Sequence, residues 1–256
     1  MVVRIPVHPI AWRERGPANY VKLLDEAIAW CTELGMYVMI DWHTIGNLRM
    51  ELFQDPMYNT TQKETYEFWL TMAKRYSGHN TVAFYELFNE PTTYRGQLGS
   101  CAWSEWKEIM ENTIKLIRSY DKNIIALVAG FDWAYDLTPL LEDPINAEGI
   151  GYVVHPYEGK RPVPKEPRWD ENFGFAAASY PVVATEFGFE LRPGETLTED
   201  HYAYRIIRYL EGRGISWLCW AFDPEWGPRL LKSWDPYVNT PSGEFFKKAM
   251  QGELNK

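Results

Sequence analysis

Residues 83–91 of this 256-residue chain read Ala-Phe-Tyr-Glu-Leu-Phe-Asn-Glu-Pro. The first six, residues 83–88, are mostly apolar or aromatic, a composition typical of a short strand inside a protein core. The Asn-Glu-Pro that follows places a carboxylic acid, Glu90, at the end of this strand. Burying such a group is costly unless it has a partner or a function, so the stretch joins a core strand to a candidate reactive residue.

The same combination of an apolar run and a polar end recurs along the chain. Strands are predicted at residues 2–7, 37–42, 83–88, 124–129, 151–155, 182–186 and 217–221, with amphipathic helices such as 19–34, 61–76, 104–120 and 199–213 between them. A near-continuous aliphatic run, as in 124–129, indicates a strand buried on both faces, as in a parallel sheet. This alternation favours a (β/α) barrel or a doubly wound sheet.

The strand ends favour the barrel. They carry polar and aromatic residues, namely Arg4, Asp41-Trp42-His43, Asn89-Glu90-Pro91, His155-Pro156-Tyr157, Glu186 and Trp220. The carboxyl ends of barrel strands converge on one face, whereas a doubly wound sheet spreads its strand ends along an edge. No glycine-rich phosphate loop follows the first predicted strands. We therefore predict an α/β fold, a (β/α)8 TIM barrel, in which residues 1–256 form a single catalytic domain.

Composition narrows the range of partners. The formal net charge of −9 disfavours nucleic acid, whose phosphates need a basic surface, and leaves neutral polysaccharides acceptable. Apolar runs stay well short of the ~20 residues of a membrane-spanning helix, so no membrane partner is expected. Aromatic residues make up 16% of the chain, and those that do not fill the core are candidates for stacking on sugar rings.

Glu90 has a counterpart later in the chain. Glu186 ends the apolar run Pro-Val-Val-Ala-Thr, 96 residues further on, and the fourth and seventh strands of a barrel face each other across its mouth. Glycoside hydrolysis needs such a pair of carboxyl groups on opposite sides of the bond that breaks. Taken alone, each glutamate could instead form a buried ion pair, for example Glu186 with Arg4.

The motifs around the two glutamates resemble glycoside hydrolase family 5, the cellulase family among the clan A retaining barrel glycosidases. The resemblance rests on Asn-Glu-Pro after one strand and on Ala-Thr-Glu-Phe-Gly after a later one. The family's active site is built from eight residue types, and each has a counterpart here in the same strand order: Arg4, His43, Asn89, Glu90, His155, Tyr157, Glu186 and Trp220. The match extends over the whole chain.

The resemblance implies a role for each carboxyl group. Glu186 would be the nucleophile, kept ionised by Arg4 and by the hydroxyl of Tyr157. Glu90 would be the general acid and base, with its pKa raised by burial and by the charge of Glu186. The reaction needs no cofactor and no metal.

The remaining motif residues would bind the sugar. Asn89 would hydrogen-bond its 2-hydroxyl, His43 and His155 would bind hydroxyls and tune the carboxyl pair, and Trp220 would floor the subsite, followed by a strained or cis peptide. Candidates for stacking on further glucose units are the tryptophans near the strand ends, namely Trp12, Trp42, Trp133, Trp169 and, best placed, Trp226. Trp217 is expected in the core, Glu86 in a salt bridge, and His8, His79 and His201 at surface or capping positions.

The chain departs from the family pattern in one respect. The resemblance implies eight strands, and seven are found, with Val-Val-Arg-Ile-Pro matching the second. The first βα unit is therefore predicted to be lacking, which makes this an N-terminally truncated barrel. Unpaired strand edges predict a gap beside Arg4, low stability or self-association.

The predicted function is retaining endo-β-1,4-glucanase (cellulase) activity on a β-linked polysaccharide or oligosaccharide, by double displacement. The alternatives are a β-mannanase or other β-glycanase of the same family, an inactive carbohydrate-binding barrel, and a metal-dependent hydrolase. The last would need a His-x-His ligand pair at the first strand, which the sequence lacks. A polymeric substrate outside the cell predicts a secreted or periplasmic location.

Overall fold

The computed structural model describes residues 1–93, 95–163, 165–192 and 194–254. It divides into two compact units, Met1–Val153 and Val154–Lys256. Each unit contains parallel strands alternating with helices, and each carries part of the predicted site.

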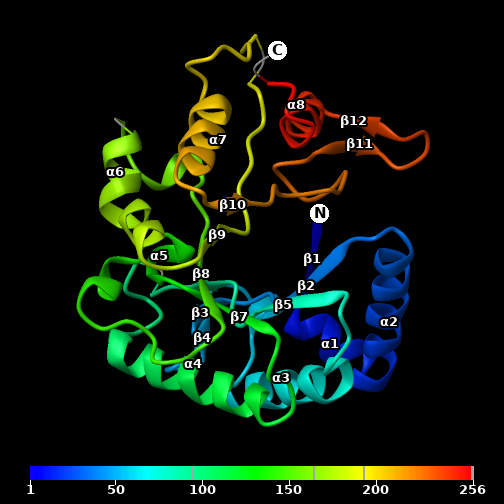
Figure 1. Cartoon of the computed structure of the whole chain (residues 1–256), viewed down its shortest axis with the longest axis vertical. Helices are drawn as coiled ribbons and strands as arrows, with labels where there is room; N and C mark the ends of the chain where they lie inside the picture. The colour runs from blue at the N-terminus through cyan, green and yellow to red at the C-terminus, as the bar shows by residue number, and fades with distance from the viewer. Residues whose placement is uncertain (94, 164, 193, 255–256) are drawn as a thin grey trace. The chain divides into compact units, whose positions relative to one another are not determined.

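The first unit is built on a parallel sheet. Its strands are β1 (Val2–Val7), β2 (Tyr37–Trp42), β5 (Val82–Glu86), β7 (Ile125–Ala129) and β8 (Ile150–Val154), and they lie in that order. Every neighbouring pair is parallel (Figure 1). Parallel neighbours need crossover connections, and predicted amphipathic helices lie in the crossovers from β1 to β2, from β2 to β5 and from β5 to β7.

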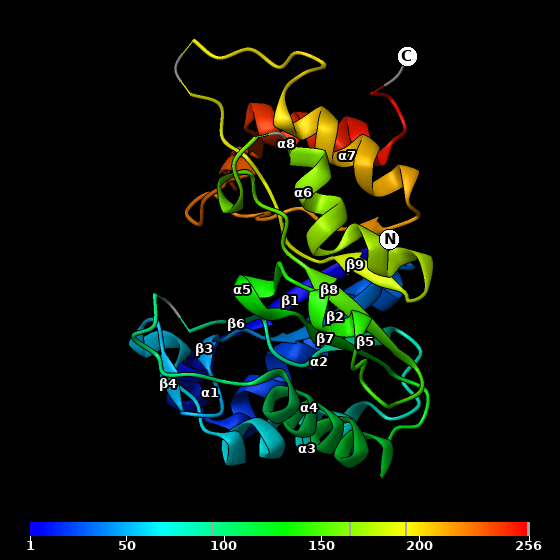
Figure 2. The same ribbon diagram turned by 90° about the vertical axis from the view of Figure 1, so that its left-hand side faces the viewer.

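Four longer helices belong to this unit, namely α1 (Pro9–Arg15), α2 (Pro17–Glu33), α3 (Gln62–Tyr76) and α4 (Trp103–Arg118). Helix α3 begins where the Thr61 side chain accepts a hydrogen bond from the Glu64 amide, a typical N-cap. Helices α3 and α4 pack side by side along the sheet (Figure 2). Two buried indoles reach from them to strand ends: Nε1 of Trp69 donates to the Leu87 carbonyl and Nε1 of Trp106 to the Ala129 carbonyl, at 3.0 and 3.1 Å.

Smaller elements follow the strand ends. A three-stranded sheet contains β4 (Leu52–Phe53), β3 (Ile45–Asn47) and β6 (Glu90–Pro91), in that order. The short helices of this unit are η1 (Pro56–Tyr58), α5 (Phe131–Ala134) and η2 (Thr138–Leu141). Glu90 therefore opens a strand of its own, beyond the end of β5.

The second unit starts at Val154, the last residue of β8. Its elements are η3 (Glu158–Lys160), α6 (Lys165–Asn172), η4 (Gly174–Ala178), β9 (Val182–Ala184), α7 (Tyr202–Gly212), β10 (Ser216–Trp217), β11 (Leu231–Ser233), β12 (Val238–Asn239) and α8 (Pro241–Met250). Strands β9 and β10 are parallel, and β11 and β12 form an antiparallel hairpin. The phenyl ring of Phe246 on α8 packs against Phe187 and Trp217. Trp217 was expected in the core and is half-buried, so its ring meets the core without being enclosed by it.

All seven predicted strands and the four predicted helices are present; β1 and β2 have the predicted ends, and the others are shifted at one or both ends. The largest shift is in the last strand, which ends at Trp217 rather than at residue 221. The short strands that follow the sheet and the β11–β12 hairpin were not predicted, because two- and three-residue strands leave too little alternation to detect. Helix α8 was not predicted either. Within the described residues, no helix has both the length and the apolar character required to cross a membrane.

Candidate active site

In the first unit, side chains from three neighbouring strands meet on one face of the sheet. Asp41 on β2 and Glu86 on β5 are direct register partners, and Arg4 on β1 lies two residues before Pro6, the partner of Asp41. Because side chains alternate between faces along a strand, these three point the same way. Both carboxylates are buried, and so is the Arg4 side chain.

Arg4 binds three acceptors within this unit. Its Nε and Nη2 donate to the two carboxylate oxygens of Glu86 at 2.8 and 2.9 Å, a bidentate pair. Nη2 also donates to Oδ1 of Asn89 at 2.6 Å and lies 3.0 Å from Oδ2 of Asp41. The salt bridge predicted for Glu86 is confirmed, and the role expected of Arg4 toward Glu186 stays a prediction.

The bond from Arg4 also orients the amide of Asn89. Because Oδ1 accepts from the guanidinium, Nδ2 is left as a donor. Nδ2 is buried and, among the described residues, has no hydrogen-bond acceptor. A buried donor in that state is ready for an acceptor on a ligand.

His43 is held by Asp41. Its Nδ1 lies 2.7 Å from Oδ2 of Asp41, and both side chains are buried. A carboxylate at this distance holds a proton on Nδ1. His43 is therefore fixed in orientation.

His8 lies against His43, which the sequence reading missed. The expected surface or capping position is confirmed, since His8 is the N-cap residue of α1 and is partly exposed. Its side chain makes no capping hydrogen bond, however, and its ring centroid is 4.5 Å from that of His43. Burial, followed by the charges of His43 and Arg4, lowers the pKa of His8 to about 3. The available signal was its position one residue after β1, the same kind of strand end that carries the other site residues.

Glu90 is fixed through its backbone. Its amide donates to the Thr44 carbonyl at 3.0 Å, and the Asn89 amide donates to the Trp42 carbonyl at 3.2 Å. These bonds tie the Asn-Glu-Pro segment to the chain leaving β2, and the Glu90 side chain is buried.

An unusual turn packs against β6. Asp132, Trp133 and Ala134 all have φ near +55°, so three consecutive non-glycine residues are left-handed. Each such residue costs roughly 1–2 kcal/mol, and strain of this kind concentrates at functional sites. The turn holds the partly exposed indole of Trp133, whose Nε1 donates to Oε1 of Gln54 at 2.9 Å.

In the second unit, Glu186 follows β9 and is buried. The Tyr157 hydroxyl donates to its Oε1 at 2.9 Å. Tyr157 is positioned in turn by Tyr202, whose hydroxyl donates to the neighbouring Pro156 carbonyl at 2.6 Å. His155 lies beside the same segment, with Nε2 3.0 Å from the Thr185 hydroxyl. The structure thus brings His155, Tyr157 and Glu186 together, as predicted.

Trp220 joins this group through the backbone. Its amide donates to the Phe187 carbonyl at 2.8 Å, directly after Glu186. A Cβ on Gly188 would lie 2.5 Å from the Trp220 carbonyl oxygen, so the close approach of the two segments requires glycine. The Trp220–Ala221 peptide is cis, as the resemblance implied.

The candidate stacking residues divide by exposure. Trp12, Trp42 and Trp169 are buried, so the stacking role considered for them is wrong and they pack in the interior. Trp133 is partly exposed and Trp226 is 45% exposed, so both rings can meet a ligand. His201 caps α7 and His79 is exposed, as expected.

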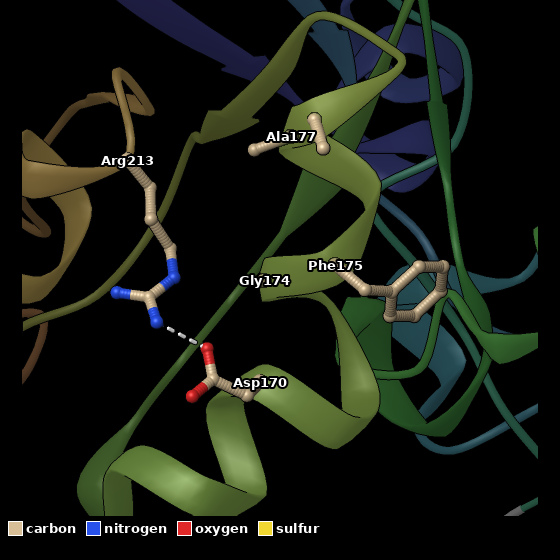
Figure 3. Close-up of a pocket in the computed structure, with 6 residues that line it drawn as sticks. Asp170, Gly174, Phe175, Ala177 and Arg213 are labelled. Atoms are coloured by element: carbon tan, nitrogen blue, oxygen red, sulfur yellow. Dashed lines mark hydrogen bonds and ion pairs between the residues drawn. The ribbon is translucent and has the colours of Figure 1, made fainter.

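The second unit also contains a hollow of about 500 Å³, lined by Asp170, Gly174, Phe175, Ala177, Ala178 and Arg213 (Figure 3). Its lining residues precede β9 and β10 in the chain, so the hollow lies at the opposite end of β9 from Glu186. Its polar groups are engaged, since Asp170 pairs with Arg213 and accepts a hydrogen bond from the Tyr209 hydroxyl. The hollow carries no candidate reactive group.

A model of the cellulase family, glycosyl hydrolase family 5, matches residues 1–225. The chain belongs to glycosyl hydrolase family 5. A solved family-5 structure, the β-glucanase SdGluc5_26A from Saccharophagus degradans, is 43% identical, with a TM-score of 0.93 over 98% of this chain and 78% of that one. The (β/α)8 class predicted from the sequence is thereby confirmed, and the lack of a first βα unit stays a prediction.

Curated relatives are more distant. Endoglucanase E-5 of Thermobifida fusca is 26% identical over 83% of this chain and 43% of its own length. An endoglucanase of Clostridium saccharobutylicum is 27% identical over 92% of this chain and 51% of its own. The chain spans about half the length of the curated relatives it matches.

Proposed function

We propose that this family-5 chain is a retaining endo-β-1,4-glucanase, in which Glu186 is the nucleophile and Glu90 the general acid and base. The observation that carries the proposal is the hydrogen bond from Tyr157 to Glu186. A hydroxyl donor stabilises the ionised form of a carboxyl group, which is the form that attacks. We extend the proposal to a single catalytic domain formed by both units.

In the proposed first step, a Glu186 oxygen attacks the anomeric carbon while Glu90 gives its proton to the departing glycosidic oxygen. The bond to the leaving sugar breaks, and an ester bond to Glu186 forms. In the second step Glu90 takes a proton from a water molecule, whose oxygen displaces Glu186. Two inversions at one carbon restore the original configuration.

The neighbouring side chains support distinct parts of this cycle. The buried Nδ2 of Asn89 is a donor for the 2-hydroxyl of the sugar, a contact that strengthens in the transition state. His43, whose ring is oriented by Asp41, is assigned to binding a sugar hydroxyl. We assign hydroxyl binding to His155 as well, and stacking on glucose rings to Trp220, Trp226 and Trp133.

The choice of a β-glucan rests on the relatives. Those cited are named endoglucanases, and one structure of SdGluc5_26A is a complex with cellotetraose. A net charge of −9 is compatible with a neutral polymer. Because such polymers lie outside the cell, we propose a secreted or periplasmic site of action. Self-association through a strand edge stays a proposal.

The decisive test follows the anomeric configuration of the first product by proton NMR during hydrolysis of a soluble cello-oligosaccharide. A β-anomer is expected, and an α-anomer would contradict the double displacement. Glu186→Gln should abolish release of reducing sugar from carboxymethylcellulose. Faster hydrolysis of mannan than of carboxymethylcellulose would replace the glucanase assignment by the mannanase alternative, and loss of activity with a chelator would favour the metal-dependent one.

A further inference from the structure

Three exposed aromatic side chains gather in the segment between β10 and α8. Phe222 is 60% exposed, Trp234 53% and Tyr237 54%. The ring centroid of Phe222 lies 5.6 Å from that of Trp234 and 6.1 Å from that of Tyr237, so the three form one surface. We refer to these residues as the aromatic cluster.

The backbone beneath the aromatic cluster is braced. Trp234 and Tyr237 flank the turn of the β11–β12 hairpin, in which the Ser233 hydroxyl donates to the Pro236 carbonyl at 2.6 Å. The hairpin is anchored by the buried Leu231 and by the Thr240 hydroxyl, which donates to the Arg229 carbonyl at 2.7 Å. The aromatic cluster therefore stands on a shaped support, which lowers the entropy lost when a ligand binds.

The aromatic cluster adds little to the core. At about 200 Å² per ring, the three side chains leave roughly 300 Å² of aromatic surface in contact with water, a size at which surface patches are often functional. Phe245 and Phe246, a few residues later on α8, are both buried. The aromatic content of the core is thus supplied by other residues.

The charge of the residues near the aromatic cluster favours a neutral ligand. The charged residues beside the aromatic cluster in sequence are Asp223, Asp235 and one exposed lysine, Lys232, and the chain as a whole is acidic. An anionic ligand would be repelled, whereas the C–H faces of a neutral β-linked sugar chain pack on aromatic rings. The aromatic cluster also continues the segment that begins at Trp220, two residues before Phe222.

We propose that Phe222, Trp234 and Tyr237 form a stacking surface for a β-linked glucan polymer, outside the residues that cleave it. The identity of the polymer rests on the proposed function. Because these rings bind the same way in the ground and transition states, they act on the affinity for long substrates and not on bond cleavage itself.

The test compares Trp234→Ala/Tyr237→Ala with Trp30→Ala, a control at an indole that is 60% exposed on α2. Dissociation constants for hydroxyethylcellulose are measured by affinity gel electrophoresis in a Glu186→Gln background, so that the polymer stays intact. Loss of two stacking rings should raise the dissociation constant about tenfold, and the control should leave it unchanged. Trp234→Phe/Tyr237→Phe, which keeps both rings, should retain most of the affinity.

In the active background, kcat/KM for the polymer should fall about five- to tenfold more than kcat/KM for an aryl cellobioside. Should the double variant unfold at a lower temperature than the parent, the single variants Trp234→Ala and Tyr237→Ala give the same readouts.

An unchanged dissociation constant, or an equal fall on both substrates, would overturn the inference. So would light scattering that shows an oligomer dissociated by the double variant while its glucan affinity persists, since the aromatic cluster would then be a contact between copies. A native protein that hydrolyses nothing but loses polymer binding in the double variant would refute the proposed function and support this inference.

Discussion

The two units hold their parts of the proposed site by different means. In the first unit, Arg4 is surrounded by the carboxylates of Asp41 and Glu86, and Asp41 also fixes His43. In the second unit, Glu186 accepts a hydrogen bond from a neutral hydroxyl, and His155 lies beside another. One arrangement is a buried ionic cluster, and the other is a set of hydrogen bonds around a single carboxyl group.

The difference predicts which substitutions affect the stability of the fold and which affect the rate of the reaction. Removing one member of a buried ionic cluster leaves an uncompensated charge, which destabilises the fold strongly. Removing a neutral donor costs about 1 kcal/mol in stability but takes away a contact to the group that reacts. We therefore expect substitutions in the first unit's cluster to act mainly on folding, and those around Glu186 mainly on rate.

The largest effect is expected when the proposed acid is deleted. Glu90→Ala should lower kcat/KM for an unactivated cello-oligosaccharide by about 10⁴-fold, because general acid catalysis contributes up to that factor. An aryl cellobioside, whose leaving group needs little protonation, should lose far less, and added azide should restore turnover of the covalent intermediate. Equal losses on both substrates would remove Glu90 from the acid role.

The next effect tests the ionic cluster. Glu86→Gln keeps the shape of the side chain but removes the charge opposite Arg4, and should lower the free energy of unfolding by about 3 kcal/mol. Asp41 remains as a partner, which limits the loss. Urea denaturation gives the measurement, with Glu67→Gln in the exposed Lys63–Glu67 pair as a control expected near zero. If the free energy of unfolding fell by less than 1 kcal/mol, the two units would not differ in the way proposed.

Tyr157→Phe should lower the rate of the reaction and leave the stability of the fold nearly unchanged. Losing a hydrogen bond to a charged carboxylate is worth about 1.5–3 kcal/mol, so kcat should fall about ten- to a hundredfold, with little change in the unfolding midpoint. Tyr209→Phe is the matched control, since it removes a similar bond to Asp170 at the opposite end of β9. If both variants reduced kcat alike, the effect would be structural.

The smallest effect concerns acid stability. Burial lowers the pKa of His8 from its ordinary 6.5 to about 3 in the fold, so between these values the unfolded chain binds a proton that the folded chain does not. Stability should therefore fall as the pH drops from about 6.5 toward 3, by less than the ~1.4 kcal/mol per pH unit that one proton allows, because the ring is partly exposed. His8→Gln should flatten this slope and the exposed His79→Gln should not; parallel slopes in urea titrations would exclude His8 as the cause.

The sequence predicted the strands that carry the site because each ends in a polar motif, and it therefore placed Glu90 and Glu186 correctly at strand ends. It did not bring His8 to the site, because His8 belongs to no motif and its strand-end position was the one signal available. It also did not reveal the left-handed turn of Trp133, because backbone conformation at non-glycine residues is set by tertiary packing. The aromatic cluster was also missed. Phe222, Trp234 and Tyr237 meet through a hairpin whose strands are too short to be read from alternation.

The indoles of Trp69 and Trp106 have a consequence for engineering. The indole of Trp69 donates a hydrogen bond to the carbonyl of Leu87, which precedes Glu90. The indole of Trp106 donates to the carbonyl of Ala129, which precedes the turn of Trp133. The functional loops thus leave the scaffold from fixed attachment points supplied by helices α3 and α4. Loop libraries grafted beyond Leu87 and Ala129 would begin from the same two anchors, so new sugar specificities can be sought without redesigning the sheet.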